Sequence, residues 1–167
     1  NPVGTPGSLT LGKGAVFTSA STDGNTYTFI TREPSSIQKN SEGRYIFSNL
    51  MVYEGALKSF RYVYNSTNQN FFPIPDVDVD TETLRVFIQP SASNATRTEY
   101  FKVESLTEVS SLTTTFYLQV NQAGRFEVRF GDGVLGKKPA DGNLITLEYI
   151  KTNGADANGI SHFTFND

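Results

Sequence analysis

The chain has 167 residues, a net charge of −3, no cysteine, 14 glycines and 13% aromatic residues. This composition favours many short strands separated by turns, so we expect a mainly β fold with little helix. Interspersed charges of both signs predict no nucleic-acid partner, the lack of a long apolar run predicts no membrane insertion, and the lack of cysteine excludes disulfides.

The length allows one domain of ordinary size or two small ones. We expect an antiparallel β-sandwich or two small packed β subdomains. Residues 1–66 would form N-terminal hairpins and strands, and residues 67–167 a second β subdomain; one continuous domain is the alternative. Because the chain begins with Asn1 and not with Met, we expect it to be an internal piece of a longer protein.

In the first half, apolar and polar side chains alternate over short stretches, as in half-buried strands. Strands are expected at residues 8–11, 15–21, 27–32 and 36–39, with two or three more between residues 45 and 64. Asp23-Gly24 is typical of a tight turn and predicts a hairpin. Phe71-Phe72-Pro73-Ile74-Pro75 should be extended but away from a sheet centre, because proline donates no hydrogen bond.

The second half shows the same alternation more strongly. Strands are expected at residues 83–89, 99–105, 115–121, 125–130, 144–150 and 160–165. Residues 122–124 should form the turn between two of these strands. Apolar residues spaced three apart in 106–112 predict one short helical turn.

A glycine-rich connection joins the strand ending at Phe130 to the strand beginning at Leu144. Its glycines match the phosphate-binding pattern G-x-G-x-x-G, but that pattern needs a helix to begin within the glycines. The residues that follow, Lys-Lys-Pro-Ala-Asp-Gly, do not continue as a helix. We therefore interpret the connection as a structural turn motif formed by Phe130, Gly131, Asp132, Gly133, Gly136, Pro139 and Gly142.

Two aspartates precede glycines in this connection. We expect the carboxylates of Asp132 and Asp141 to accept local backbone N–H groups while Gly133 or Gly142 takes positive φ. On the same reasoning, valine at Gly131 or Gly133 should destabilise the domain, because a β-branched residue disfavours positive φ.

No other pattern predicts chemistry. Asp76, Asp78 and Asp80 have the spacing of a calcium loop, but Thr81 replaces its glycine and Phe87 its closing glutamate, so we expect solvent-facing acids. His162 is the only histidine, which leaves no zinc ligand set and no catalytic triad with sequence support. We expect no catalytic, metal-binding or cofactor-binding residues, and hence no enzyme.

Several short blocks carry a family resemblance. The blocks are Gly7-Ser8-Leu9-Thr10, Gly12-Lys13-Gly14, Tyr27-Thr28-Phe29, Val52-Tyr53-Glu54-Gly55, Phe72-Pro73-Ile74-Pro75, Val79-Asp80, Phe130-Gly131-Asp132-Gly133 with Gly136 and Pro139, and Tyr149, Thr152, Gly154, Asn158-Gly159 and Phe163. Through them the chain resembles the baseplate wedge protein of T4-like contractile-tailed bacteriophages, which is similar to the wider baseplate J-like family.

The resemblance implies a structural subunit of the virion tail baseplate, assembled in the host cytoplasm. In that family the wedge protein pairs with itself and with other wedge proteins to make a ring, and it rearranges when the sheath contracts. A homo-oligomer is therefore expected for the full-length protein. The rival hypothesis is a carbohydrate- or receptor-binding tail module, which would use aromatic loop residues in a concave site.

Overall fold

The computed structural model describes residues 6–20, 24–67 and 70–166, and confirms the mainly β fold. Strands β1 to β13 are accompanied by two 3-10 turns, η1 and η2. The chain divides into two compact units, one of Asn1–Leu57 with Thr152–Asp167 and one of Lys58–Lys151. In the described ranges, no helix has the length and apolar character needed to cross a membrane.

These units differ from the predicted division between residues 66 and 67. Strand β13 (Phe163–Asn166) pairs with β2 (Val16–Ser19), which returns the end of the chain to the first unit. Most of β6 (Ala56–Val63) lies in the second unit, where it is a neighbour of β12 (Leu144–Lys151). Pairing between segments distant in sequence thus sets the units, and local patterning does not reveal such pairing.

The first unit contains two small sheets. One has the order β13-β2-β3-β5, with β3 at Thr28–Thr31 and β5 at Val52–Glu54, and the other pairs β1 (Ser8–Leu11) with β4 (Ser35–Gln38). The predicted hairpin is present as the antiparallel pair β2–β3, although residues 21–23 of its turn lie outside the described residues. Residues 45–49 form no strand.

Glu54, at the end of β5, binds the segment in which the chain re-enters the first unit after β12. Its carboxylate accepts hydrogen bonds from the Thr152 hydroxyl at 2.6 Å and from the backbone and side-chain N–H groups of Asn153 at 2.9 and 2.7 Å. Farther along, η2 spans Gly154–Ala157, and the Phe163 ring of β13 packs edge-on against Phe29 of β3, 4.7 Å away. Polar contacts therefore hold the chain where it returns at Thr152 and Asn153, and an aromatic contact holds the final strand.

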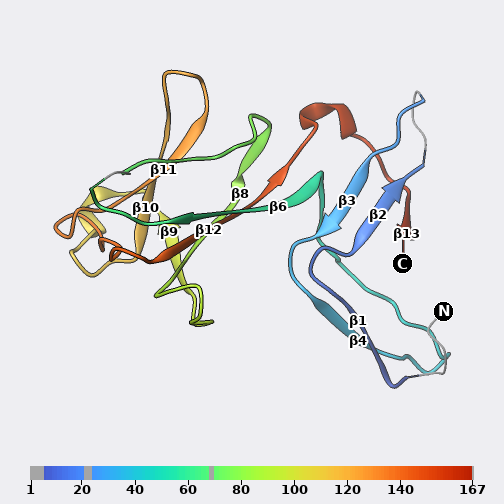
Figure 1. The fold of residues 1–167 in the computed structure, drawn as a ribbon. Helices are drawn as coiled ribbons and strands as arrows, with labels where there is room; N and C mark the ends of the chain where they lie inside the picture. The colour runs from blue at the N-terminus through green and yellow to red at the C-terminus, as the bar shows by residue number, and fades with distance from the viewer. Residues whose placement is uncertain (1–5, 21–23, 68–69, 167) are drawn as a thin grey trace. The chain divides into compact units, whose positions relative to one another are not determined.

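The second unit is a seven-stranded sheet with the order β6-β12-β8-β9-β10-β11-β7. Figure 1 labels all of these strands except β7. The remaining strands of the sheet are β7 (Phe72–Pro73), β8 (Val79–Gln89), β9 (Thr98–Lys102), β10 (Thr115–Val120) and β11 (Phe126–Phe130). Strands β9 and β10 are parallel, a departure from the antiparallel prediction, and the intervening crossover carries η1 (Leu106–Glu108), the predicted short turn. Parallel neighbours require such a crossover in place of a hairpin turn.

The two edge strands of this sheet meet through their side chains. Tyr62 of β6 lies 5.4 Å from Phe72 of β7, measured between ring centroids, and its hydroxyl donates to the Pro73 carbonyl. The sheet is therefore rolled around one core, with Phe72 fully buried inside it. The place of β7 at the edge agrees with the expectation for a segment that contains proline.

Strand β12 is more buried than the alternation in its sequence predicts. Ile145, Leu147 and Tyr149 enter the core, while Thr146 and Glu148 on the opposite face are buried as well. The strand lies in the interior of the sheet, between β6 and β8. On the outer face, the guanidinium of Arg97 pairs with the Glu148 carboxylate at 2.9 Å, which compensates for the burial of that charge.

The acidic row is only partly solvent-facing, which corrects the prediction for Asp76. Its carboxylate accepts a 2.7 Å hydrogen bond from the Tyr149 hydroxyl and lies 3.4 Å from the Lys151 ammonium. Asp80 accepts the backbone N–H of Glu82 at 3.0 Å, and Asp78 is exposed. Among the described residues, no group of three or more acidic, histidine or cysteine side chains is placed to hold a metal ion.

Stability of the second unit should fall in acid through Asp76. The hydrogen bond from Tyr149, and then the contacts with Lys151, lower the pKa of the Asp76 carboxyl. A lowered folded-state pKa contributes stability above the unfolded value of about 3.9, and this contribution is lost as pH falls through the folded value. Asp76→Asn should therefore flatten the loss of the unfolding free energy below about pH 4, measured by urea titration at several pH values. Asp78→Asn is the matched control, and equal pH profiles for the two variants would contradict the assignment.

Candidate functional site: the turn motif after β11

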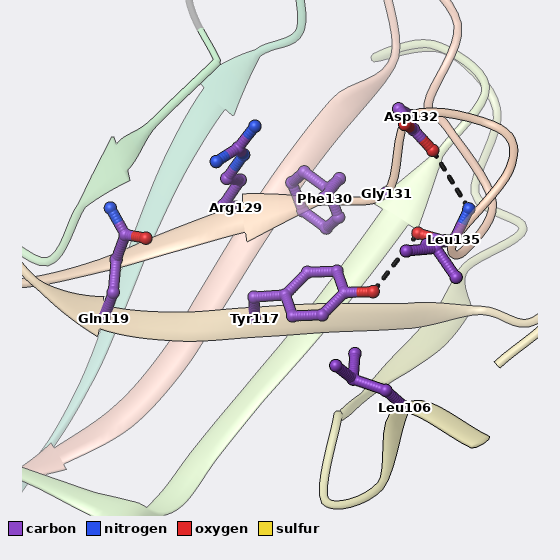
Figure 2. Close-up of a pocket in the computed structure, with 8 residues that line it drawn as sticks. All are labelled: Leu106, Tyr117, Gln119, Arg129, Phe130, Gly131, Asp132 and Leu135. Carbon is purple, nitrogen blue, oxygen red and sulfur yellow. Dashed lines mark hydrogen bonds between the residues drawn. The ribbon is translucent and has the colours of Figure 1, made fainter. Parts of the chain in front are cut away.

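The motif begins with a turn closed by Asp132. One oxygen of its carboxylate, Oδ1, accepts the backbone N–H group of Val134 at 2.8 Å. The same oxygen accepts the backbone N–H group of Leu135 at 3.0 Å (Figure 2). These bonds, from Leu135 first, lower the pKa of Asp132, and Arg129 adds a smaller effect of its charge. Gly133 follows at φ +94° and its N–H bonds the Gly136 carbonyl at 3.1 Å. The predicted local role of Asp132 and the positive φ of Gly133 are confirmed.

Gly131 is required for a different reason from the one expected. It is not among the residues with positive φ. Instead, a Cβ atom there would lie 2.3 Å from the Leu135 carbonyl oxygen and 2.4 Å from that of Gly136. Both obstructing atoms belong to backbone, which has little freedom to move in a bonded turn. The expectation of positive φ was wrong for Gly131, and close packing of the chain against itself replaces it.

The tip of the motif is bound to the crossover between β9 and β10. The N–H of Gly136 donates to the Ser110 carbonyl at 3.1 Å and that of Lys137 to the Thr113 carbonyl at 2.8 Å. Gly136 has φ +90°, and a Cβ there would meet the Thr115 side chain at 2.9 Å. Backbone hydrogen bonds thus join the motif to a crossover that precedes it in the sequence by the whole β10–β11 hairpin.

The far end of the motif is anchored differently from the prediction for Asp141. Its carboxylate accepts hydrogen bonds from a residue 75 positions away, from the backbone N–H of Ser66 at 2.7 Å and from the Ser66 hydroxyl at 3.1 Å, in place of the expected local N–H. These bonds lower its pKa. Gly142 has the expected positive φ, +85°, and donates to the Tyr64 carbonyl at 2.9 Å. Pro139 is buried.

A hollow of about 260 Å³ opens beside the motif. Its lining comes from three parts of the second unit and consists of Leu106, Tyr117, Gln119, Arg129, Phe130, Gly131, Asp132 and Leu135. Tyr117 of β10 lies directly opposite Arg129 of β11 in the register, and its hydroxyl donates to the Leu135 carbonyl at 3.3 Å (Figure 2).

The structure brings part of the predicted motif to the hollow. Phe130, Gly131 and Asp132 line it, whereas Gly133, Gly136, Pro139 and Gly142 do not. Sequence reasoning missed Tyr117 and Arg129, although counting back from the predicted turn at 122–124 places them opposite each other. It had no means of finding Leu106, because η1 reaches the hollow only through the crossover.

Apolar side chains are exposed around the motif. Val134 is 72% exposed and Leu135 47%; in the neighbouring crossover Leu106 is 59% and Leu112 80% exposed. Groups of exposed apolar side chains on an ordered surface often mark interaction sites. The arrangement has the character of a binding surface; in the described residues we find no nucleophile–base pair at the motif.

No family model matches this chain. Over 177 aligned residues it is 26% identical to a curated protein, the baseplate wedge protein gp6 of Enterobacteria phage T4. The chain is distantly related to a baseplate protein. The match covers 95% of this chain and 26% of the phage protein, so the chain spans about a quarter of its relative's length. The relationship to baseplate proteins indicated by the sequence blocks is thus supported over nearly the whole chain.

Proposed function

We propose that this chain is part of a structural subunit of a viral tail baseplate wedge and that it performs no chemical reaction. The observation that carries the proposal is the similarity to the phage T4 wedge protein along 95% of the chain. Because the chain spans about a quarter of that relative, the wedge-family assignment, the assembly role and the partners are all parts of the proposal.

The proposed partners are other baseplate wedge proteins and further copies of the same protein, in the virion tail after assembly in the host cytoplasm. The ordered motif with its exposed Val134 and Leu135 supports an assembly role, because it presents apolar groups on a fixed backbone. The division into two compact units supports the proposed rearrangement on sheath contraction, since separate units are able to move as bodies.

A second candidate is a carbohydrate- or receptor-binding tail module. The observation in its favour is the hollow, where the Tyr117 ring lies with the polar side chains of Gln119, Arg129 and Asp132. Aromatic rings beside convergent polar groups are typical of small-ligand sites.

Deleting the corresponding gene from the source virus separates the two candidates. A wedge subunit predicts tail tubes and sheaths without organised baseplates, restored by supplying the protein in trans. Complete tails that fail only to attach to cells would overturn the wedge proposal and favour the receptor-binding module. Electron microscopy of lysates gives the readout.

A further inference from the structure

We propose that the hollow beside the turn motif binds a carboxylate carried on a short apolar side chain, supplied by an acidic residue of a neighbouring protein. The group that would recognise it is the guanidinium of Arg129, with Tyr117 and Leu135 receiving the apolar part. The inference rests on the proposed function only for the identity of that neighbour.

Arg129 is oriented but makes no ion pair within the part of the chain that the structure describes. Its guanidinium carbon lies 5.3 Å from the centroid of the Phe71 ring, a cation–π arrangement that occupies one face. The edge of a guanidinium stacked in this way still presents N–H groups for a two-point bond with a carboxylate.

The nearest acid along β11 is already engaged. Glu127 projects on the same side of the strand as Arg129, but its carboxylate accepts from the Gln119 amide at 2.6 Å and the Asn121 amide at 3.4 Å. The charge of Glu127 is therefore bound by neutral amides, and the cation beside it is left for another acceptor.

Asp132 also lines the hollow, and its negative charge would oppose a bound carboxylate. Its Oδ1 atom is used by two backbone N–H groups, and Arg129 contributes to its lowered pKa, so the two charges interact without the contact of an ion pair. An incoming carboxylate must gain more from Arg129 than it loses to Asp132. Neutralising Asp132 should therefore strengthen binding, whereas neutralising Arg129 should abolish it.

The size of the hollow favours a side chain over a larger ligand. About 260 Å³ is slightly below the usual range of small-molecule pockets and accommodates one side chain with an apolar neighbour. Among the residues that line the hollow, Arg129 carries the positive charge and Asp132 the negative one. An acidic group of a partner is the electrostatic complement of Arg129.

The test is a titration of the isotopically labelled chain with 4-methylpentanoate, followed by NMR. This probe has a carboxylate and a branched apolar end, and its neutral amide, 4-methylpentanamide, has the same shape. We expect a Kd on the order of 10 mM for the carboxylate, from the low affinity typical of so few atoms. The shifts should be concentrated at Tyr117, Arg129 and Leu135, and the amide should bind at least about fivefold more weakly, because charge-assisted bonds are the stronger kind.

Three variants complete the experiment. Arg129→Gln should weaken binding at least about fivefold, and Asp132→Asn, which keeps the oxygen that accepts the two N–H groups, should strengthen it about two- to threefold. Arg125→Gln is the matched control for loss of one positive charge on the same hairpin; Arg125 donates to the Pro75 carbonyl at 2.8 Å and does not line the hollow. It should leave the affinity unchanged.

Equal binding of acid and amide, equal losses in the two arginine variants, or absence of shifts at 50 mM probe, five times the expected Kd, would overturn the inference. A neutral methyl pyranoside that shifts the same resonances while the carboxylate does not would overturn it in favour of a carbohydrate. None of these outcomes depends on where the protein lies in a virion. The carboxylate-site proposal would therefore be overturned by them without affecting the wedge proposal.

Discussion

Replacing Gly131 by alanine should lower the free energy of unfolding by more than about 3 kcal/mol, at the upper end of overpacking costs. The added Cβ would lie 2.3 and 2.4 Å from two carbonyl oxygens, and its relief requires the turn at Asp132 to open. Loss of that turn would also release the bonds to Ser110 and Thr113. Urea denaturation of the purified chain measures the change.

Alanine substitutions at two other glycines distinguish the effect of steric overlap from the effect of backbone strain. Gly133 has φ +94° with only the Lys138 Cβ nearby at 3.9 Å, so alanine there should cost about 1–2 kcal/mol. Gly12 has no atom within 4 Å and no positive φ, so alanine there should change stability by less than about 0.5 kcal/mol. If Gly131→Ala lowered the free energy of unfolding no more than Gly133→Ala does, the close approach of the carbonyl oxygens to Gly131 would be contradicted.

Phe72→Ala should lower the free energy of unfolding by about 3–5 kcal/mol, the usual range for a buried aromatic residue. Its ring is fully buried and contacts Tyr62, Tyr64 and Phe130, at centroid distances of 5.4, 5.9 and 5.5 Å. Truncation would leave a cavity where the two edges of the rolled sheet meet. The midpoint of urea denaturation gives the measurement.

Phe71 is the matched control, since it is the same residue type one position earlier and is 41% exposed. Its truncation removes the stacking on Arg129 and should cost less than about 1 kcal/mol. Similar losses for the two variants would show that β7 does not direct Phe72 into the core.

Local sequence patterns predicted most strands because apolar residues recur at every second position along them. Leu84, Val86 and Ile88 alternate with polar or outward-facing residues, and β8 follows from them. Pro73 and Pro75 placed their segment at an edge because proline removes a donor from the ladder. The two glycines of the motif with correctly assigned positive φ, Gly133 and Gly142, each follow an aspartate, which is a local turn signal.

Local sequence patterns did not predict features that depend on contacts between residues distant in the sequence. Thr146 and Glu148 are buried on the outer face of β12, where Glu148 pairs with Arg97, 51 positions away. The bonds from Ser66 to Asp141 cross 75 positions, and the steric requirement at Gly131 arises from carbonyls whose positions are set by the whole turn. At the candidate site, the sequence allowed the pairing of Tyr117 with Arg129 to be predicted by counting residues back from the hairpin turn. It did not allow the position of Leu106 beside the hollow to be predicted.

The central claim is that this chain belongs to a baseplate wedge. Its most direct test is immuno-electron microscopy of purified tails from the source virus, with antibodies raised against the chain and with both extended and contracted sheaths. We predict labelling at the ring of the baseplate in both states. Labelling confined to fibres or tail tips, or absent from intact and disrupted tails alike, would contradict the claim.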